Sequence, residues 1–213
     1  MASPVTEITT VTLKPNIDLE APGPWLDTLA TIASQDGYIG LQYGRQLEEP
    51  DMLMLLIDWT SLAKHQQFID SPIYGDFVKR FGAILTDIQI YHVETTPFPP
   101  AILTKSPCIE FATFYNIEPG FLENLGKFAS VLDEAKPKEF YGGALGPVVG
   151  EITQPKEGAT AGNAAVLFFG WESREAHAAF RNTELFANNI FLLREKLGGA
   201  KVFHVAFEEY LSK

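Results

Sequence analysis

The four histidines of the chain fall into two pairs that share one spacing. Adding 112 to the numbers of His65 and His92 gives His177 and His204. The same shift relates further identical pairs, namely Trp59 and Trp171, Ser61 and Ser173, Phe68 and Phe180, and Val93 and Val205. A single register that pairs every histidine indicates that the chain contains two copies of one fold unit. An internal repeat of this kind strongly restricts the folds that a chain can adopt.

Nearer the start of each copy the register changes to a shift of 96, which relates Trp25 to Phe121 and Leu29 to Leu125. The second copy has therefore gained residues in loops. One gain lies around Asp133–Lys138, and the other lies within Thr153–Asn163, a stretch rich in Gly, Ala and Thr. That composition is typical of a loop, and we expect the second loop to be a candidate lid.

Both copies predict the same order of elements, strand, helix, strand, strand, two helices, strand. The predicted strands are Glu7–Leu13, Tyr38–Gly44, Met52–Trp59 and Ile88–Glu94 in the first copy, and Cys108–Tyr115, Phe140–Gly146, Ala164–Trp171 and Lys201–Phe207 in the second. Pro24 and Pro119 suit the starts of the first helices. The last helix of each copy is predicted from an apolar stripe, which is Tyr74, Val78, Phe81 and Leu85, or Phe186, Ile190, Leu193 and Leu197.

This order predicts an α+β, ferredoxin-like tandem repeat, because each helix pair can cover one face of its sheet. We expect the first repeat over residues 1–96, a proline-rich linker over 97–107 and the second repeat over 108–213. The two antiparallel sheets are expected to pair into an α+β barrel within one chain, as a pseudo-dimer that could also form a homodimer.

The composition excludes several classes of function. A net charge of −11 without a basic stripe speaks against nucleic acid as a partner. No apolar run is long enough to span a membrane, and no secretory signal is seen, so a cytoplasmic protein is expected. Cys108 is the single cysteine, and no motif for nucleotides or zinc occurs, so neither a bound metal nor a cofactor is expected.

The strand that ends in tryptophan, followed by a short helix and a break, resembles the dimeric α+β barrel superfamily and its antibiotic biosynthesis monooxygenase (ABM) branch. The two stretches read MLMLLIDWTSLAKHQQFIDSPIYGDF and AAVLFFGWESREAHAAFRNTELFANN. The resemblance covers nearly the whole chain in two copies. It implies a cofactor-independent oxygenase of quinol-like or anthrone-like aromatics, a haem-degrading enzyme, a polyketide cyclase or a protein without chemistry.

Haem degradation is disfavoured within that family, because Phe68 and Phe180 stand where haem-degrading members have tryptophan, and Val78 and Ile190 stand near the haem-ligating histidine position. Quinol oxygenases often place a histidine where Phe68 and Phe180 stand. In this chain the histidines come three residues earlier.

His65 and His177 are the candidate catalytic bases, since an imidazole with a pKa near 6.5 can remove a proton from a phenol or an activated carbon. The alternative is a buried histidine bonded to a backbone carbonyl. Tyr43 is the candidate proton donor. Asn116, at a strand end, is a conceivable carbonyl partner or a turn residue.

The candidate substrate-binding residues are aromatic side chains and the histidines of the last strands. Strand alternation puts His92 on one face with Ile88 and Ile90, and His204 on one face with Ala200 and Val202. These histidines either line a cavity or pack in an interface. The complete set is Trp59, Phe68, His92, Tyr141, Trp171, Phe180 and His204.

We therefore expect a cofactor-free enzyme that acts on an aromatic or polyketide-like small molecule through a histidine base, with a monooxygenase favoured by the resemblance. The alternatives are a polyketide cyclase, isomerase or decarboxylase, or a non-catalytic ligand-binding or stress-associated protein. The longer loop favours the second repeat as the working half.

Overall fold

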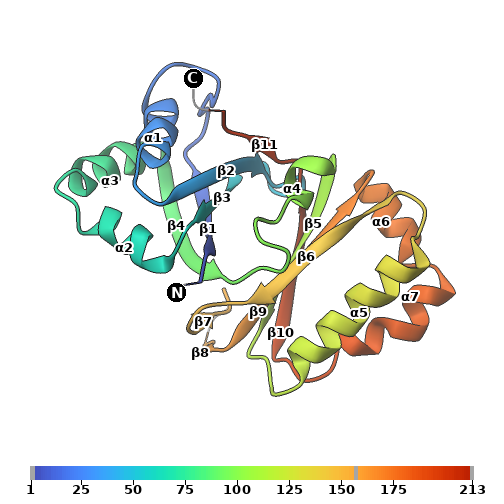
Figure 1. The fold of residues 1–213 in the computed structure, drawn as a ribbon. Coiled ribbons are helices and arrows are strands. Elements are labelled where there is room, and N and C mark those ends of the chain that lie inside the picture. Colours follow the sequence, from blue (N-terminus) through green and yellow to red (C-terminus); the bar gives the residue numbers. More distant parts are fainter. Residues whose placement is uncertain (1–2, 156–157, 212–213) are drawn as a thin grey trace. The chain divides into compact units, whose positions relative to one another are not determined.

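The computed structural model describes residues 3–155 and 158–211. By their internal contacts these residues divide into two compact units. One unit runs to His92 and also includes the residues from Glu208, and the other is Val93–Phe207. Figure 1 shows that three helices of the first unit lie on one face of its sheet, and that the longer helices of the second unit lie on one face of that unit's sheet.

The first unit has the element order that the sequence predicts. Its elements are β1 (Val5–Leu13), α1 (Pro24–Ala33), β2 (Tyr38–Arg45), β3 (Met52–Trp59), α2 (Leu62–Ile69), α3 (Tyr74–Gly82) and β4 (Leu85–Val93). The strand order is β11-β2-β3-β1-β4, in which β11 (Glu208–Glu209) adds antiparallel to the edge strand β2.

The second unit repeats this plan. It contains α4 (Ile102–Lys105), β5 (Cys108–Tyr115), α5 (Phe121–Ala135), β6 (Phe140–Pro147), β7 (Ile152–Thr153), β8 (Ala161–Gly162), β9 (Ala164–Trp171), α6 (Arg174–Phe180), α7 (Glu184–Asn189), the 3₁₀ helix η1 (Ile190–Leu193) and β10 (Gly199–Val205). Its sheet order β10-β5-β9-β6 corresponds to β4-β1-β3-β2. The α+β, ferredoxin-like class is confirmed, whereas the pairing of the two sheets into a barrel stays a prediction.

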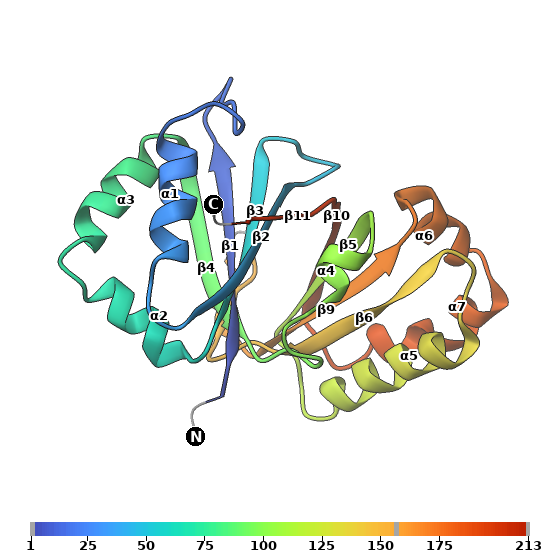
Figure 2. The same ribbon diagram turned by 45° about the horizontal axis from the view of Figure 1, so that its top comes forward.

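Figure 2 shows the same layering from another direction, with α1, α2 and α3 beside the first sheet and α5, α6 and α7 beside the second. Equivalent caps start equivalent helices. The hydroxyl of Ser61 accepts a hydrogen bond from the Lys64 amide at the start of α2, and that of Ser173 accepts one from the Ala176 amide at the start of α6. Such caps satisfy free amides of a first turn, so the repeated serine sets where each histidine-bearing helix begins.

The predicted apolar stripes are wrong in detail. In α3 the buried residues are Phe77 and Phe81, whereas Val78 is 47% exposed and Leu85 already begins β4. In the second unit, α7 ends at Asn189 and continues as the 3₁₀ helix η1, so the stripe is not one continuous α-helix. The tighter 3₁₀ winding changes which side chains share a face.

Two segments that the sequence marks as linker or loop carry structure of their own. The residues that the sequence marks as linker contain α4, in which Ile102 and Leu103 are buried. The predicted loop Thr153–Asn163 contains the strand β8 and the last residue of β7, which pair with each other, while its residues 156–157 lie outside the described residues. Among the helices of the described ranges, none is long and apolar enough to cross a membrane.

Candidate active site

Each sheet holds a glutamate beside its tryptophan, Glu7 buried in the first unit and Glu110 mostly buried in the second. β1 pairs antiparallel with β3, so that Val5 lies opposite Trp59, and this register places Glu7 within reach of the indole. Trp59 Nε1 donates to Glu7 Oε2 at 2.9 Å. In the second unit Cys108 lies opposite Trp171 by the same register, and Trp171 Nε1 donates to Glu110 Oε2 at 3.0 Å. The repeat thus reproduces a buried carboxylate as well as the tryptophan.

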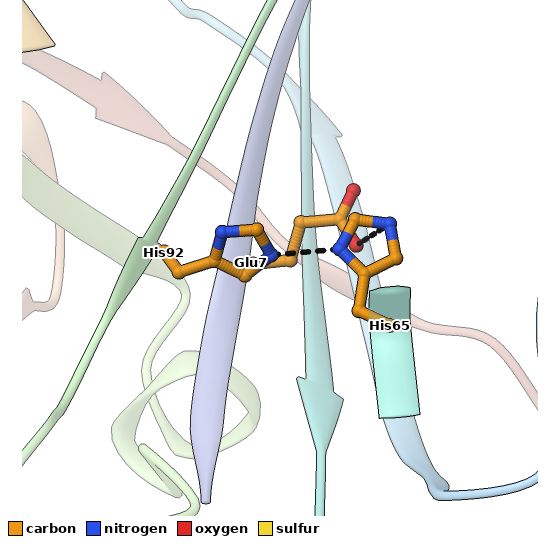
Figure 3. Close-up of side chains that lie close together, drawn as sticks. All are labelled: Glu7, His65 and His92. Atoms are coloured by element: carbon orange, nitrogen blue, oxygen red, sulfur yellow. Dashed lines mark hydrogen bonds and ion pairs between the residues drawn. The ribbon is translucent and has the colours of Figure 1, made fainter. Parts of the chain in front are cut away.

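A chain of hydrogen-bonding groups continues from the carboxylate of the first unit (Figure 3). His65 lies one turn into α2 and stacks on Trp59, with the ring centroids 5.1 Å apart and the planes inclined by 14°. Its Nε2 lies 3.4 Å from Glu7 Oε2, and its Nδ1 lies 2.7 Å from His92 Nε2. The dashed lines in Figure 3 run from one ring nitrogen of His65 to His92 and from the other ring nitrogen to the Glu7 carboxylate.

The second unit contains the same chain. His177 stacks on Trp171 at 5.4 Å and 15°. Its Nε2 lies 3.4 Å from Glu110 Oε2, and its Nδ1 lies 2.9 Å from His204 Nε2. The first histidine of each repeat is therefore bonded to side chains and not to a backbone carbonyl, which removes the alternative raised by the sequence.

Burial determines the ionisation of these groups. In the first unit desolvation raises the pKa of the Glu7 carboxyl. It lowers the pKa of His65 to about 4, and it also lowers the pKa of His92. In the second unit desolvation raises the pKa of Glu110 to about 7 and lowers the pKa of His177 to about 4. Because burial disfavours charge, His65 and His177 are neutral at pH 7, and Glu110 is balanced between its two forms.

The two glutamates differ in their second oxygen. Glu7 Oε1 accepts a hydrogen bond from the Thr9 hydroxyl at 2.7 Å. The equivalent residue two positions after Glu110 is Ala112, which has no donor, and among the described residues nothing donates to Glu110 Oε1. One carboxylate oxygen of the second unit is therefore free to meet a bound molecule.

A cavity opens beside each chain, and the two cavities differ in size. That of the first unit has a volume of about 90 Å³ and is lined by Glu7 and His65 among apolar side chains. That of the second unit has a volume of about 300 Å³ and is lined by Glu110 and His177 among apolar side chains, with Arg181 and Arg194. Pockets for small molecules generally begin at roughly 300 Å³, so only the second cavity has room for a polycyclic ligand.

The structure brings together most of the predicted site residues. Phe68 lines the first cavity with Trp59 and His65, and Phe180 lines the second with His177. His92 and His204 are bonded to the cavity-lining histidines and do not themselves line the cavities. Their strand neighbours do, namely Ile88, Ile90, Ala200 and Val202. Trp171 lies fully buried behind His177, outside the cavity lining.

The predicted tyrosines lie elsewhere. Tyr43 packs edge-on against Trp25 and its hydroxyl donates to Glu208 at 3.3 Å, away from the cavity of its unit. Tyr141 is 48% exposed, and its hydroxyl donates to Glu172. Asn116 adopts a positive φ of 51°, as expected for a turn residue, and it is absent from the cavity lining.

Sequence reasoning missed Glu7 and Glu110. The signal was present, because each is a charged residue inside an otherwise apolar or hydroxyl-bearing first strand, and both copies retain it. Charged side chains are almost never fully buried unless they are paired. A charge that recurs in the first strand of both copies therefore indicated a buried partner set.

Glu7, His65 and His92 also form a candidate metal site, since one ligand atom from each lies within 4.8 Å of the others. Two nitrogens bound to one zinc ion at about 2.0 Å are separated by about 3.3 Å in a tetrahedral site. His65 and His92 approach to 2.7 Å, which is a hydrogen-bond distance, and His65 uses opposite ring nitrogens for its two contacts. The arrangement fits a proton-conducting chain and does not fit a chelate without rearrangement.

Comparison with known proteins agrees with this fold. Residues 25–80, inside the first repeat, match the family described as antibiotic biosynthesis monooxygenase. A crystal structure of an anthrone oxidase-like protein shares the fold with a TM-score of 0.70 at 14% identity, covering 97% of this chain and 93% of that one. No curated protein sequence matches the chain.

Two further crystal structures share the fold over the full length. A proposed monooxygenase from Lactobacillus acidophilus NCFM has a TM-score of 0.60 at 11% identity, with 96% of this chain and 94% of that chain covered. One from Fusobacterium nucleatum has a TM-score of 0.59 at 11% identity, with 100% and 99% covered. The ABM family match lies within the first repeat, and the full-length structural matches show that the α+β fold of the tandem chain is shared over its whole length.

Proposed function

We propose that the second repeat is the active site of a cofactor-independent monooxygenase that acts on an aromatic, polyketide-like substrate of the quinol or anthrone type. One observation carries the proposal, the connected set of Glu110, His177 and His204, whose first two members lie 3.4 Å apart and line a cavity of about 300 Å³, and whose two histidines are hydrogen-bonded. The shared fold of the anthrone oxidase-like protein supports the same chemistry.

The first step is removal of a proton from the substrate by Glu110. Its Oε1 is free of donors, and its pKa of about 7 matches a general base that works near neutral pH. The sequence named His65 and His177 as the candidate bases. In this proposal His177 instead supports the base: neutral His177 donates Nε2–H to the ionised carboxylate, and its Nδ1 accepts from His204 Nε2–H.

The remaining chemistry needs no external reductant. The carbanion of an activated CH₂ group transfers electrons to O₂ and forms a C–O bond, which gives a hydroperoxide after protonation by the Glu110–His177 pair. Loss of the second C–H proton with cleavage of the O–O bond gives a ketone and one water. The balance is R₂CH₂ + O₂ → R₂C=O + H₂O, so the substrate supplies all the electrons.

The apolar walls contribute by excluding water. Phe128, Phe169, Phe180 and Phe186 line the cavity and pack on one another, with ring centroids 5.6 Å apart for Phe180 and Phe186 and 6.2 Å apart for Phe128 and Phe169. Flat aromatic ligands pack well in such surroundings. A low local dielectric also strengthens the interaction of the substrate anion with nearby donors and cations.

The test is oxygen uptake by the metal-stripped protein with a panel of quinols and anthrones. His177→Ala is expected to lose uptake, whereas the matched His65→Ala is expected to retain it, with circular dichroism confirming that both variants fold. Uptake that requires added metal, or that is lost only in His65→Ala, contradicts the proposal. Substrate conversion without oxygen uptake indicates a cyclase, isomerase or decarboxylase, and binding without conversion indicates a ligand-binding protein.

We also propose, as the sequence predicts, that the protein is cytoplasmic and needs neither nucleic acid nor membrane as a partner. In this proposal the tandem chain is a pseudo-dimer, and light scattering can test whether it pairs again as a homodimer.

A further inference from the structure

Two arginines line the cavity of the second unit, Arg181 directly after α6 and Arg194 directly after η1. Both residues are exposed, which places their guanidinium groups toward solvent. Arg181 is close enough to Glu110 to act on it electrostatically. The two cations therefore stand at the outer part of a cavity whose inner part holds the carboxylate and His177.

Neither guanidinium donates a hydrogen bond or forms a salt bridge within the described part of the chain, although the backbone amides of both arginines bond within their own helices. By contrast, Arg45 and Arg80 of the first unit donate to defined oxygens. A pair of unbonded guanidiniums beside an apolar cavity is suited to an anion that arrives from outside.

Basic residues after helices also have a purely structural explanation, because they stabilise the negative end of a helix. Here α6 has only seven residues, and Arg194 follows the four-residue 3₁₀ turn that ends α7, so neither helix is long. Moreover, the shift of 112 relates Arg181 to Ile69 and Arg194 to Gly82. The first unit folds in the same way without either cation, so the fold does not require them.

We propose that Arg181 and Arg194 bind a carboxylate of the substrate, so that the enzyme acts on an aromatic acid. In this arrangement the rings lie among the phenylalanines, the carboxylate lies between the arginines, and the reactive carbon faces Glu110 Oε1. A chain of net charge −11 repels an anionic substrate at long range, and two local cations at the cavity offset that repulsion. This inference rests on the proposed function, because it concerns the same cavity.

The experiment is a fluorescence titration of the intact chain with two matched probes, 9-anthracenecarboxylate and the neutral 9-anthracenemethanol. The wild type is expected to prefer the carboxylate, and the double variant Arg181→Gln/Arg194→Gln is expected to weaken carboxylate binding on the order of tenfold while neutral binding changes little. Arg174→Gln is the control, since it removes the same charge from α6 outside the cavity lining. Added salt is expected to weaken only carboxylate binding.

Equal binding of both probes by the wild type, equal losses for both probes in the double variant, or no binding of either probe overturns the inference. The titration needs no turnover, so it is independent of the oxygen-uptake test. If the wild type prefers the carboxylate probe but takes up no oxygen, the monooxygenase proposal is refuted and the aromatic-acid site stands. If neither probe is preferred and the double variant takes up oxygen as the wild type does, the aromatic-acid site is refuted and the monooxygenase proposal stands.

Discussion

The two repeats share the same polar side chains at the candidate site and differ in the residues and the cavity around them. Both contain a glutamate, a tryptophan and two histidines that contact one another in the same order, with corresponding distances that agree within about 0.2 Å. The first repeat adds a donor to its glutamate and has a cavity of about 90 Å³, whereas the second has a free carboxylate oxygen and about 300 Å³. The comparison teaches that the chain of polar groups is part of the fold, and that space and charge around it decide where chemistry can occur.

The largest expected difference concerns the two glutamates. Glu110→Gln keeps the shape and the hydrogen bond from Trp171 but removes the base, so oxygen uptake is expected to fall by about 10²- to 10⁴-fold. Glu7→Gln is expected to leave uptake within about twofold, because its cavity is too small for the substrate. Equal losses in the two variants would show that the repeats act together.

Replacement of the tryptophans tests the shared part of the comparison. Trp59→Phe and Trp171→Phe each leave a buried carboxylate without its indole donor and remove a fully buried ring system. Each is expected to lower the free energy of unfolding by about 2–3 kcal/mol, measured by urea denaturation. A cost in one repeat only would mean that the polar chain stabilises just that repeat.

Replacement of the residue two positions after each glutamate tests whether the hydrogen bond from Thr9 explains the difference between the two repeats. Ala112→Thr introduces the hydroxyl that Thr9 supplies to Glu7, and a hydrogen bond to the carboxylate lowers its pKa. The pH–rate profile is expected to shift to lower pH by about one unit, and the maximal rate is expected to fall roughly tenfold because the base is weaker. The control is Thr9→Ala, for which an altered profile would contradict the assignment of catalysis to the second repeat.

The pH dependence of stability gives the smallest expected effect. The pKa of Glu110 is raised by burial to about 7, so the folded state binds this proton more tightly than the unfolded state, and stability falls as the pH rises toward and through 7. The lowered pKa of His177, about 4, acts in the opposite direction but only below about pH 6.5. Between pH 6.5 and 8 the wild type is therefore expected to lose about 1 kcal/mol more than Glu110→Gln, as measured by urea denaturation at each pH.

Several features could be predicted from the sequence because they depend on local pattern. The strands Met52–Trp59, Cys108–Tyr115 and Ala164–Trp171 have the predicted bounds, since each is an apolar run between turn residues. The pairing of histidines by one shift also indicated that each pair belongs to one site. Other predictions failed where the local pattern was ambiguous, as in α3, where Val78 and Phe77 both fit a helical stripe and the structure buries Phe77.

The candidate site likewise has features that the sequence predicts and features that only the tertiary structure shows. The sequence by itself determined the repeated fold, the residues that recur and the elements that carry them, because these follow from periodicity and from the repeat. Only the tertiary structure decided that Glu7 and Glu110 join the histidines, since their contact with tryptophan depends on strand register between residues about 50 to 60 positions apart. The size of each cavity likewise depends on how helices pack on the sheet, and packing is a property of the whole unit and not of any single stretch of sequence.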